Sequence, residues 1–135
     1  MTEKGIFEIA YAPGTPERIT VRIEPGEDGD VWMTANEIVK AYGVFHQTVR
    51  AGLKALKKSG DFDPYKDVRI ERFQYKGKQC GMELYNLRTV IALGFRMEGT
   101  VCREFRKWVT SRLADSCRRK SSALFLYMGK DTIMN

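Results

Sequence analysis

Apolar and polar residues alternate in two short runs near the start of the chain. Residues 6–11 alternate weakly, and in residues 18–24 every second side chain is Ile or Val, which is typical of a half-buried strand. The stretch 25–30 is rich in Pro, Gly and Asp and predicts a turn. The apolar run 31–33 is then expected to return as the partner of residues 18–24. The pattern predicts an N-terminal β-hairpin with an acidic tip.

Helical periodicity follows directly. Thr34 with Glu37 three residues later forms a capping-box signature, which predicts a helix start. Gly43 is expected to end this first helix, since glycine readily takes the positive φ of a helix stop. A second amphipathic helix is predicted from residue 45 or 46 to residue 58, and Ser59-Gly60 ends it. The pattern therefore predicts two short helices joined by a glycine turn.

The rest of the chain predicts a second hairpin and two further helices. Residues 68–75 alternate cleanly, residues 76–79 form a turn that carries two lysines, and residues 80–84 return in matching phase. A largely apolar helix is expected over residues 87–96, and a longer one from residue 100 to at least residue 113. The fold class is accordingly α+β: a winged helix-turn-helix-like domain with an N-terminal β-hairpin, a β-hairpin wing and two C-terminal helices.

The chain has 135 residues, a length that fits one domain. We expect a single winged-helix-like domain over residues 1–115 and a tail over residues 116–135 that is first basic and then apolar. No run of about 18 apolar residues exists, so no membrane span is expected. The start of the chain has no pattern of a secretory signal, which favours a cytoplasmic location.

The sequence offers little for metal binding or catalysis. Its three cysteines lie far apart and it has one histidine, whereas structural zinc needs four closely spaced ligands. The cysteines are therefore interpreted as reduced, packed thiols. We expect no enzyme activity, no cofactor and no metal. A magnesium-dependent nuclease remains as a disfavoured alternative, with four candidate carboxylates: Asp61, Asp63, Asp67 and Glu71.

The net charge of +6 is distributed unevenly. Residues 1–34 are acidic, whereas residues 35–60 and 100–120 are two basic blocks. A basic block often marks a polyanion partner, and the alternative is a solvated helix face. For the second block, residues 100–120, two interpretations remain: a contact with the backbone of a nucleic acid, or a solvated helix face.

The first basic block coincides with the helix pair, whose spacing is that of a helix-turn-helix. On the second helix Val49, Leu53 and Leu56 share one face, and polar donors share the other at about 100° per residue. Arg50 suits a guanine edge and Gln47 an adenine edge, while the lysines suit phosphates. The candidate DNA-binding residues on the helix and the hairpin tip are His46, Gln47, Thr48, Arg50, Lys54, Lys57, Lys58, Lys76 and Lys78.

Two stretches resemble a known family. Residues 31–56, VWMTANEIVKAYGVFHQTVRAGLKAL, look like the amino-terminal part of the RhuM-type virulence-associated family. Residues 84–113 resemble its most recognisable run: Tyr-Asn-Leu, an apolar helix ending in Gly-aromatic-Arg, and then Phe-Arg-x-Trp-x-Thr. Departures include Phe45, where relatives usually place Ser or a similar cap, and Arg112, which interrupts the apolar stripe of the last helix.

The resemblance covers roughly residues 19–114 and implies a small DNA-binding module of bacterial mobile elements, pathogenicity islands and phage-like loci. Its layout is similar to that of phage KilA-N and Bro amino-terminal modules. The expected function is double-stranded DNA binding, sequence-specific or structure-guided, by a transcriptional regulator or accessory factor of such a locus. The expected partners are double-stranded DNA and a second copy bound through the last helix or the C-terminal tail.

An interaction module remains as the alternative to DNA binding. In this interpretation the protein is an antirepressor-like adaptor that keeps a degenerate helix-turn-helix. Two features motivate it: Phe45 at the start of the second helix and the apolar run 124–128 in the tail.

Overall fold

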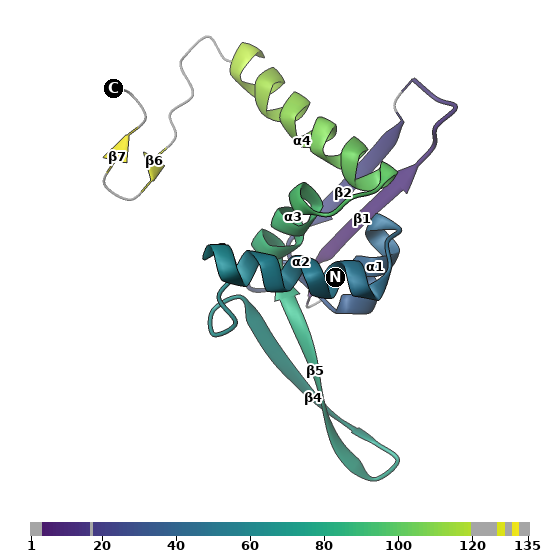
Figure 1. Ribbon diagram of the computed structural model, residues 1–135, viewed down its shortest axis with the longest axis vertical. Coiled ribbons are helices and arrows are strands. Elements are labelled where there is room, and N and C mark those ends of the chain that lie inside the picture. Colours follow the sequence, from purple (N-terminus) through teal and green to yellow (C-terminus); the bar gives the residue numbers. More distant parts are fainter. Residues whose placement is uncertain (1–3, 17, 120–126, 129–130, 133–135) are drawn as a thin grey trace.

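The computed structural model describes residues 4–16, 18–119, 127–128 and 131–132. Within them the protein has the α+β fold that the sequence predicts, with helices interposed between antiparallel strand pairs (Figure 1). The helices are α1 (Ala35–Tyr42), α2 (His46–Ser59), α3 (Leu87–Arg96) and α4 (Thr100–Arg119). The strands are β1 (Ile6–Tyr11), β2 (Ile19–Glu24), β3 (Trp32–Met33), β4 (Val68–Tyr75), β5 (Lys78–Asn86), β6 (Tyr127–Met128) and β7 (Asp131–Thr132).

The N-terminal hairpin exists, but its strands differ from the sequence prediction. β2 pairs antiparallel with β1 over the whole of both strands, whereas β3 pairs with β5. Asp30 Oδ1 accepts hydrogen bonds from the amides of Val31 at 2.7 Å and Leu87 at 3.1 Å, which ties the segment before β3 to the start of α3. The predicted pairing of residues 31–33 with 18–24 is therefore wrong: a contact between residues distant in sequence outweighs the local turn signal.

The predicted hairpin over residues 68–84 is confirmed as β4 and β5. Its register is unbroken, and its turn is the two-residue loop Lys76-Gly77, shorter than expected. Both loop residues have positive φ, 52° and 77°, as a type I′ turn requires. Only the base of this hairpin lies near the helices, and the remainder projects from the body (Figure 1).

A polar cluster ties the base of the hairpin to β3. The indole Nε1 of Trp32 donates a hydrogen bond to Asp28 Oδ2 at 2.8 Å, and the Arg69 guanidinium of β4 lies 4.8 Å from the centre of the Trp32 ring. The hydrogen bond from Trp32 lowers the pKa of Asp28. The acidic turn predicted from the sequence therefore contacts β4.

α1 begins and ends as predicted. Thr34 Oγ1 accepts a hydrogen bond from the Glu37 amide at 3.1 Å, and the Glu37 carboxylate accepts one from the Thr34 amide at 2.9 Å. Gly43 ends the helix with φ 65°, and its N–H donates to the Val39 carbonyl. Val44 then packs, partly buried, against the core and leads into α2.

Three aromatic rings join the N-terminal hairpin to the helices. Phe7 of β1, Tyr42 of α1 and Phe105 of α4 have centroid separations of 5.8, 5.7 and 5.4 Å. The Tyr42 hydroxyl donates to the Val90 carbonyl of α3 at 2.7 Å, and burial raises the pKa of Tyr42. A Cβ on Gly94 would lie 2.6 Å from that hydroxyl oxygen and 2.7 Å from the Phe105 ring. A larger residue at Gly94 would therefore separate α3 from α1 and α4.

α4 is longer than the predicted minimum and reaches Arg119. Cys102 and Phe105 are buried as predicted, but Leu113 is 52% exposed because the second half of the helix extends past the body (Figure 1). Arg112 places its guanidinium 5.3 Å from the centre of the Trp108 ring. The apolar run 124–128 lies outside the residues whose side chains are described.

Candidate nucleic-acid interface

α2 is attached to the body through one apolar face. Val49 and Leu56 are buried and Leu53 is partly buried, as the pattern predicts. Gly52 adds to this face, because a Cβ there would lie 2.8 Å from the Leu93 side chain of α3. The close approach at Gly52 fixes the rotation of α2, and hence which side chains it exposes.

The opposite face of α2 is an exposed arc of cationic and amide side chains. Among the described residues, none of these side chains has a hydrogen bond, ion pair or ring contact with the rest of the protein. The arc comprises His46, Gln47, Arg50, Lys54, Lys57 and Lys58, all of them exposed. Six of the nine predicted site residues therefore lie together on one exposed surface.

Thr48 does not belong to that arc. It is half-buried and lines a recess between α2 and the end of α3, together with Gln47, Ala51 and Arg96. Thr48 follows Gln47 by about 100° around the helix, which turns it toward α3. Thr48 was predicted to face outward with the other donors, but it lies at the side of α2 that faces α3.

Two arginines of α3 border α2 and were not predicted as site residues. Arg96 lines the recess beside Gln47, and Arg88 lines a second recess beside Leu56. Both are exposed, and among the described residues neither has an ion pair. No periodicity within α2 could have identified them, because their position depends on how α3 packs against it.

The hairpin tip lies away from α2. In Figure 1 α2 is near the base of the β4–β5 hairpin, whereas the turn is at its far end. Lys76 is exposed and its Nζ lies 5.4 Å from the centre of the Tyr75 ring, and Lys78 is exposed one residue beyond the turn. The two lysines thus form a separate cationic site rather than an extension of the arc.

The second basic block is engaged mostly within the protein. Arg106 donates to the carbonyls of Gly94 at 3.1 Å and Met97 at 3.0 Å, which holds the end of α3 against α4. Lys107 pairs with Glu104, Arg118 with Asp115, and Arg112 covers Trp108. These contacts favour the solvated-face interpretation of α4.

The four carboxylates considered for a nuclease do not converge. Asp61 and Asp63 each accept a hydrogen bond from a residue two positions away. Asp67 is buried and accepts from Asn86 Nδ2 at 2.9 Å, and Glu71 lies on β4. Within the described part of the chain, no three His, Cys, Asp or Glu side chains are placed to hold a metal ion.

The three thiols are free but differ in burial. Cys102 is buried, and burial raises the pKa of its thiol. Cys80 is partly buried on β5, whereas Cys117 is exposed because α4 extends past the body at that point. The prediction that all three are packed is wrong for Cys117.

Comparison with family models, curated proteins and solved structures finds no match to this chain. No helix in the described ranges is long and apolar enough to cross a membrane. The strongest functional feature is therefore the exposed arc on α2, which has no partner within the described residues and has Arg96 of α3 beside Gln47 at its edge.

Proposed function

We propose that this protein binds double-stranded DNA with α2 as a recognition helix in the major groove. The observation that carries the proposal is the exposed arc of α2, whose cations have no partner within the described residues. On α4, by contrast, Arg106, Lys107, Arg112 and Arg118 contact carbonyls, carboxylates or a ring, and only Arg103 and Arg119 have no partner within the described residues. An apolar inner face with donors outside is what a docked recognition helix requires.

Within the arc, the residues suit different parts of DNA. Arg50 and Gln47 lie in the first half of α2 and can form bidentate hydrogen bonds with guanine and adenine edges. Lys54, Lys57 and Lys58 continue toward its end and suit phosphates. Arg96 stands beside Gln47 and adds a phosphate contact from α3.

The β4–β5 hairpin serves as the wing in this proposal. An eight-residue strand rises about 25 Å at roughly 3.3 Å per residue. That reach suits a contact with the backbone or minor groove beyond the segment that α2 occupies. Lys76 and Lys78 at the tip supply the cations, and in this proposal the hairpin and the α1–α2 pair act together as a winged helix-turn-helix.

The biological role follows from the family resemblance. The Tyr-Asn-Leu and Phe-Arg-x-Trp-x-Thr runs resemble the RhuM-type family, which supports a regulator or accessory factor of a mobile element or phage-like locus. In the structure the Gly-aromatic-Arg run contributes Gly94, where three helices meet, and Arg96, at the edge of α2. The resembling residues thus have both packing and surface roles.

A second candidate function is supported by Phe45. Its side chain is 81% exposed at the N-terminus of α2, next to His46 and Gln47 of the arc. An exposed aromatic ring beside the arc is suited to a protein partner. The antirepressor-like alternative is therefore kept, with Phe45 as its central contact.

Duplex binding measured by fluorescence polarisation tests the DNA proposal. At about 50 mM salt, micromolar protein should bind a mixed-sequence duplex, and log affinity should fall linearly with log salt. Arg50→Ala should reduce the preference among selected sequences, whereas Lys54→Ala should weaken all duplexes about equally. Absence of duplex binding under these conditions would overturn the proposal and favour the interaction module.

A further inference from the structure

The outer part of the β4–β5 hairpin, residues 72–81, has two faces of different composition. Alternate residues of a strand share a face, and so do residues opposed across the ladder. On one face the register places four side chains: Phe73, Tyr75, Lys78 and Cys80. On the other face it places Arg72, Gln74, Gln79 and Gly81. The outer hairpin therefore has an aromatic face and a polar face.

The side chains of the polar face contact one another. The Gln74 side-chain amide donates a hydrogen bond across the strands to the side-chain oxygen of Gln79. Gly81 leaves room for the Ile70 side chain, which would lie 3.2 Å from a Cβ at that position. The polar face is thus largely satisfied within the hairpin itself.

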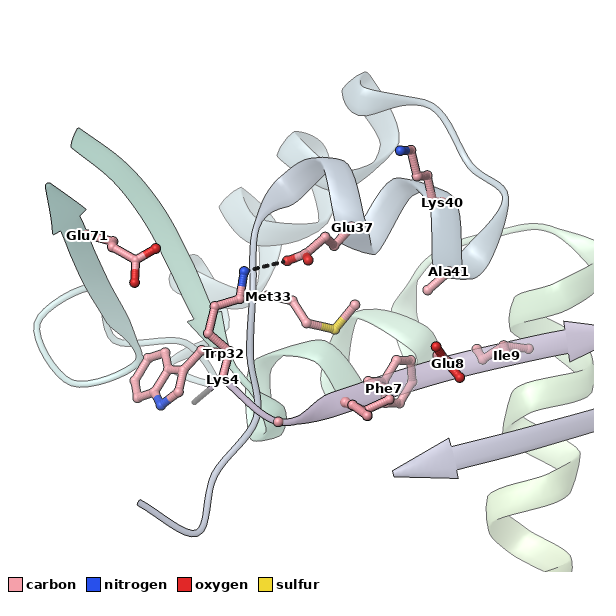
Figure 2. A pocket seen from close by; sticks show the side chains of 12 residues that line it. Lys4, Phe7, Glu8, Ile9, Trp32, Met33, Glu37, Lys40, Ala41 and Glu71 are labelled. Carbon is pink, nitrogen blue, oxygen red and sulfur yellow. Dashed lines mark hydrogen bonds and ion pairs between the residues drawn. The ribbon is translucent and has the colours of Figure 1, made fainter. Parts of the chain in front are cut away.

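The aromatic face is open. Phe73 is 40% exposed and Tyr75 is 59% exposed. Within the described residues, neither side chain belongs to the core, and neither ring packs against another aromatic ring. Figure 2 shows Glu71, two residues before Phe73, at the hairpin end of a groove of about 830 Å³ between β1 and α1. In the described part of the chain, no hairpin residue beyond Glu71 lines that groove, so the aromatic face extends past the body.

The charge of the outer hairpin favours a polyanion as the occupant of this face. Residues 72–81 include one Arg and two Lys but no Asp or Glu. Lys76 Nζ lies 5.4 Å from the centre of the Tyr75 ring, and Lys78 is opposed to Tyr75 across the ladder. Lysine is depleted in protein–protein interfaces, whereas sites for single-stranded nucleic acids combine stacking aromatic rings with cations. The combination therefore fits nucleobases better than a protein surface.

The spacing of the two rings suits bases that are not stacked in a duplex. Phe73 and Tyr75 are two residues apart on β4, which is a spacing of about 7 Å at roughly 3.4 Å per residue. That is about two base steps, because successive bases of a duplex strand are about 3.4 Å apart. One unpaired base can therefore stack between the rings. Bases inside a duplex are covered by their neighbours and cannot be reached in this way.

We propose that the aromatic face of the outer hairpin stacks on unpaired bases that adjoin the duplex bound by α2. The preferred ligand is then a junction between double-stranded and single-stranded DNA. Phe73 and Tyr75 provide the stacking surface, and Lys76 and Lys78 contact phosphates near the junction. This inference rests on the proposed function, because α2 holds the duplex, and it adds the class of DNA that the whole protein recognises.

Fluorescence polarisation at about 50 mM salt tests the inference with two ligands. One is a blunt mixed-sequence duplex, and the other is the same duplex with about six unpaired nucleotides added at one end. The extended duplex should bind at least about tenfold more tightly, which is within the range for one base stacked on an aromatic side chain. Phe73→Ile/Tyr75→Ile removes both rings but keeps apolar, β-branched residues in the strands, so it should abolish this preference. Phe73→Trp keeps a ring and should retain it.

Tyr65→Ile is the matched control, because Tyr65 is an exposed ring in the loop between α2 and β4. It should leave the preference unchanged, and circular dichroism of each variant checks the fold. Binding of the extended duplex without measurable binding of the blunt one would support the inference and contradict the proposal for α2. Equal affinity of wild type for the two ligands would overturn the inference and leave duplex binding intact. A preference that survives in Phe73→Ile/Tyr75→Ile would also overturn it, as would a dimer in sedimentation equilibrium that this variant dissociates.

Discussion

Lys76 combines an unfavourable backbone conformation with an exposed charge. Its φ of 52° is in the left-handed region, which the type I′ turn requires and which Asn, Asp or Gly occupy more readily. For other residues that conformation costs about 1–2 kcal/mol. Lys76 therefore occupies the tip of the projecting hairpin despite this cost. The DNA proposal gives a reason for a cation there, because Lys76 would contact the DNA backbone.

Lys76→Asn separates the two properties of this position. Asparagine tolerates the turn better, so the variant should slow hydrogen exchange of the β4–β5 amides about two- to fivefold. It also removes a cation, so duplex affinity at about 50 mM salt should fall and the salt slope should become shallower by about 1. Unchanged affinity together with slower exchange would exclude a wing contact at Lys76.

Gly94 tests the close packing of the helices. In Gly94→Ala the added Cβ meets Tyr42 Oη at 2.6 Å and the Phe105 ring at 2.7 Å, so α3 must shift. We expect the free energy of unfolding, measured with urea, to fall by about 1–3 kcal/mol. Gly14→Ala is the matched control, because a Cβ there has no neighbour within 4 Å. Equal stability of the two variants would contradict this packing.

Among the elements, α1 and α2 begin differently although they form one unit. α1 has a complete capping box, whereas α2 starts at Phe45 with no side-chain cap. The backbone of Phe45 already has the extended conformation of an N-cap, φ −93° and ψ 157°. What α2 lacks is therefore only a side-chain oxygen at this position.

Phe45→Ser supplies that oxygen. The hydroxyl can accept from an amide in the first turn of α2, so the free energy of unfolding should rise by about 0.5–1 kcal/mol in urea denaturation. Duplex affinity should stay within about twofold of wild type, since Phe45 has no part in the phosphate and base contacts proposed for the arc. Loss of duplex binding with a retained fold would instead place Phe45 in the interface with DNA.

Most elements could be predicted from the sequence because their signals are local. The capping box, the glycine after α1 and the alternation of β4 all act within a few residues. The partner of β3 could not be predicted, since the bond from Leu87 to Asp30 joins residues 57 positions apart. Arg96 could not be predicted as a site residue either, because its position beside α2 depends on how α3 packs against α2.

At the scale of the whole molecule, the two basic blocks have different environments. On α2 the cations of the arc have no partners within the described residues, whereas on α4 most of the basic residues contact carboxylates, carbonyls or a ring. The net charge of +6 is thus less informative than its placement. The central claim is that α2, and not positive charge in general, binds DNA.

A charge-matched comparison of two double variants tests this claim most directly. Arg50→Gln/Lys54→Gln and Arg103→Gln/Lys107→Gln each remove one Arg and one Lys, four residues apart on an exposed helix face. Duplex affinity is measured by polarisation between about 50 and 200 mM salt. The α2 variant should lose at least about thirtyfold in affinity and about 1–2 in salt slope, and the α4 variant less than about threefold. Equal losses in both, or a larger loss in the α4 variant, would contradict the account.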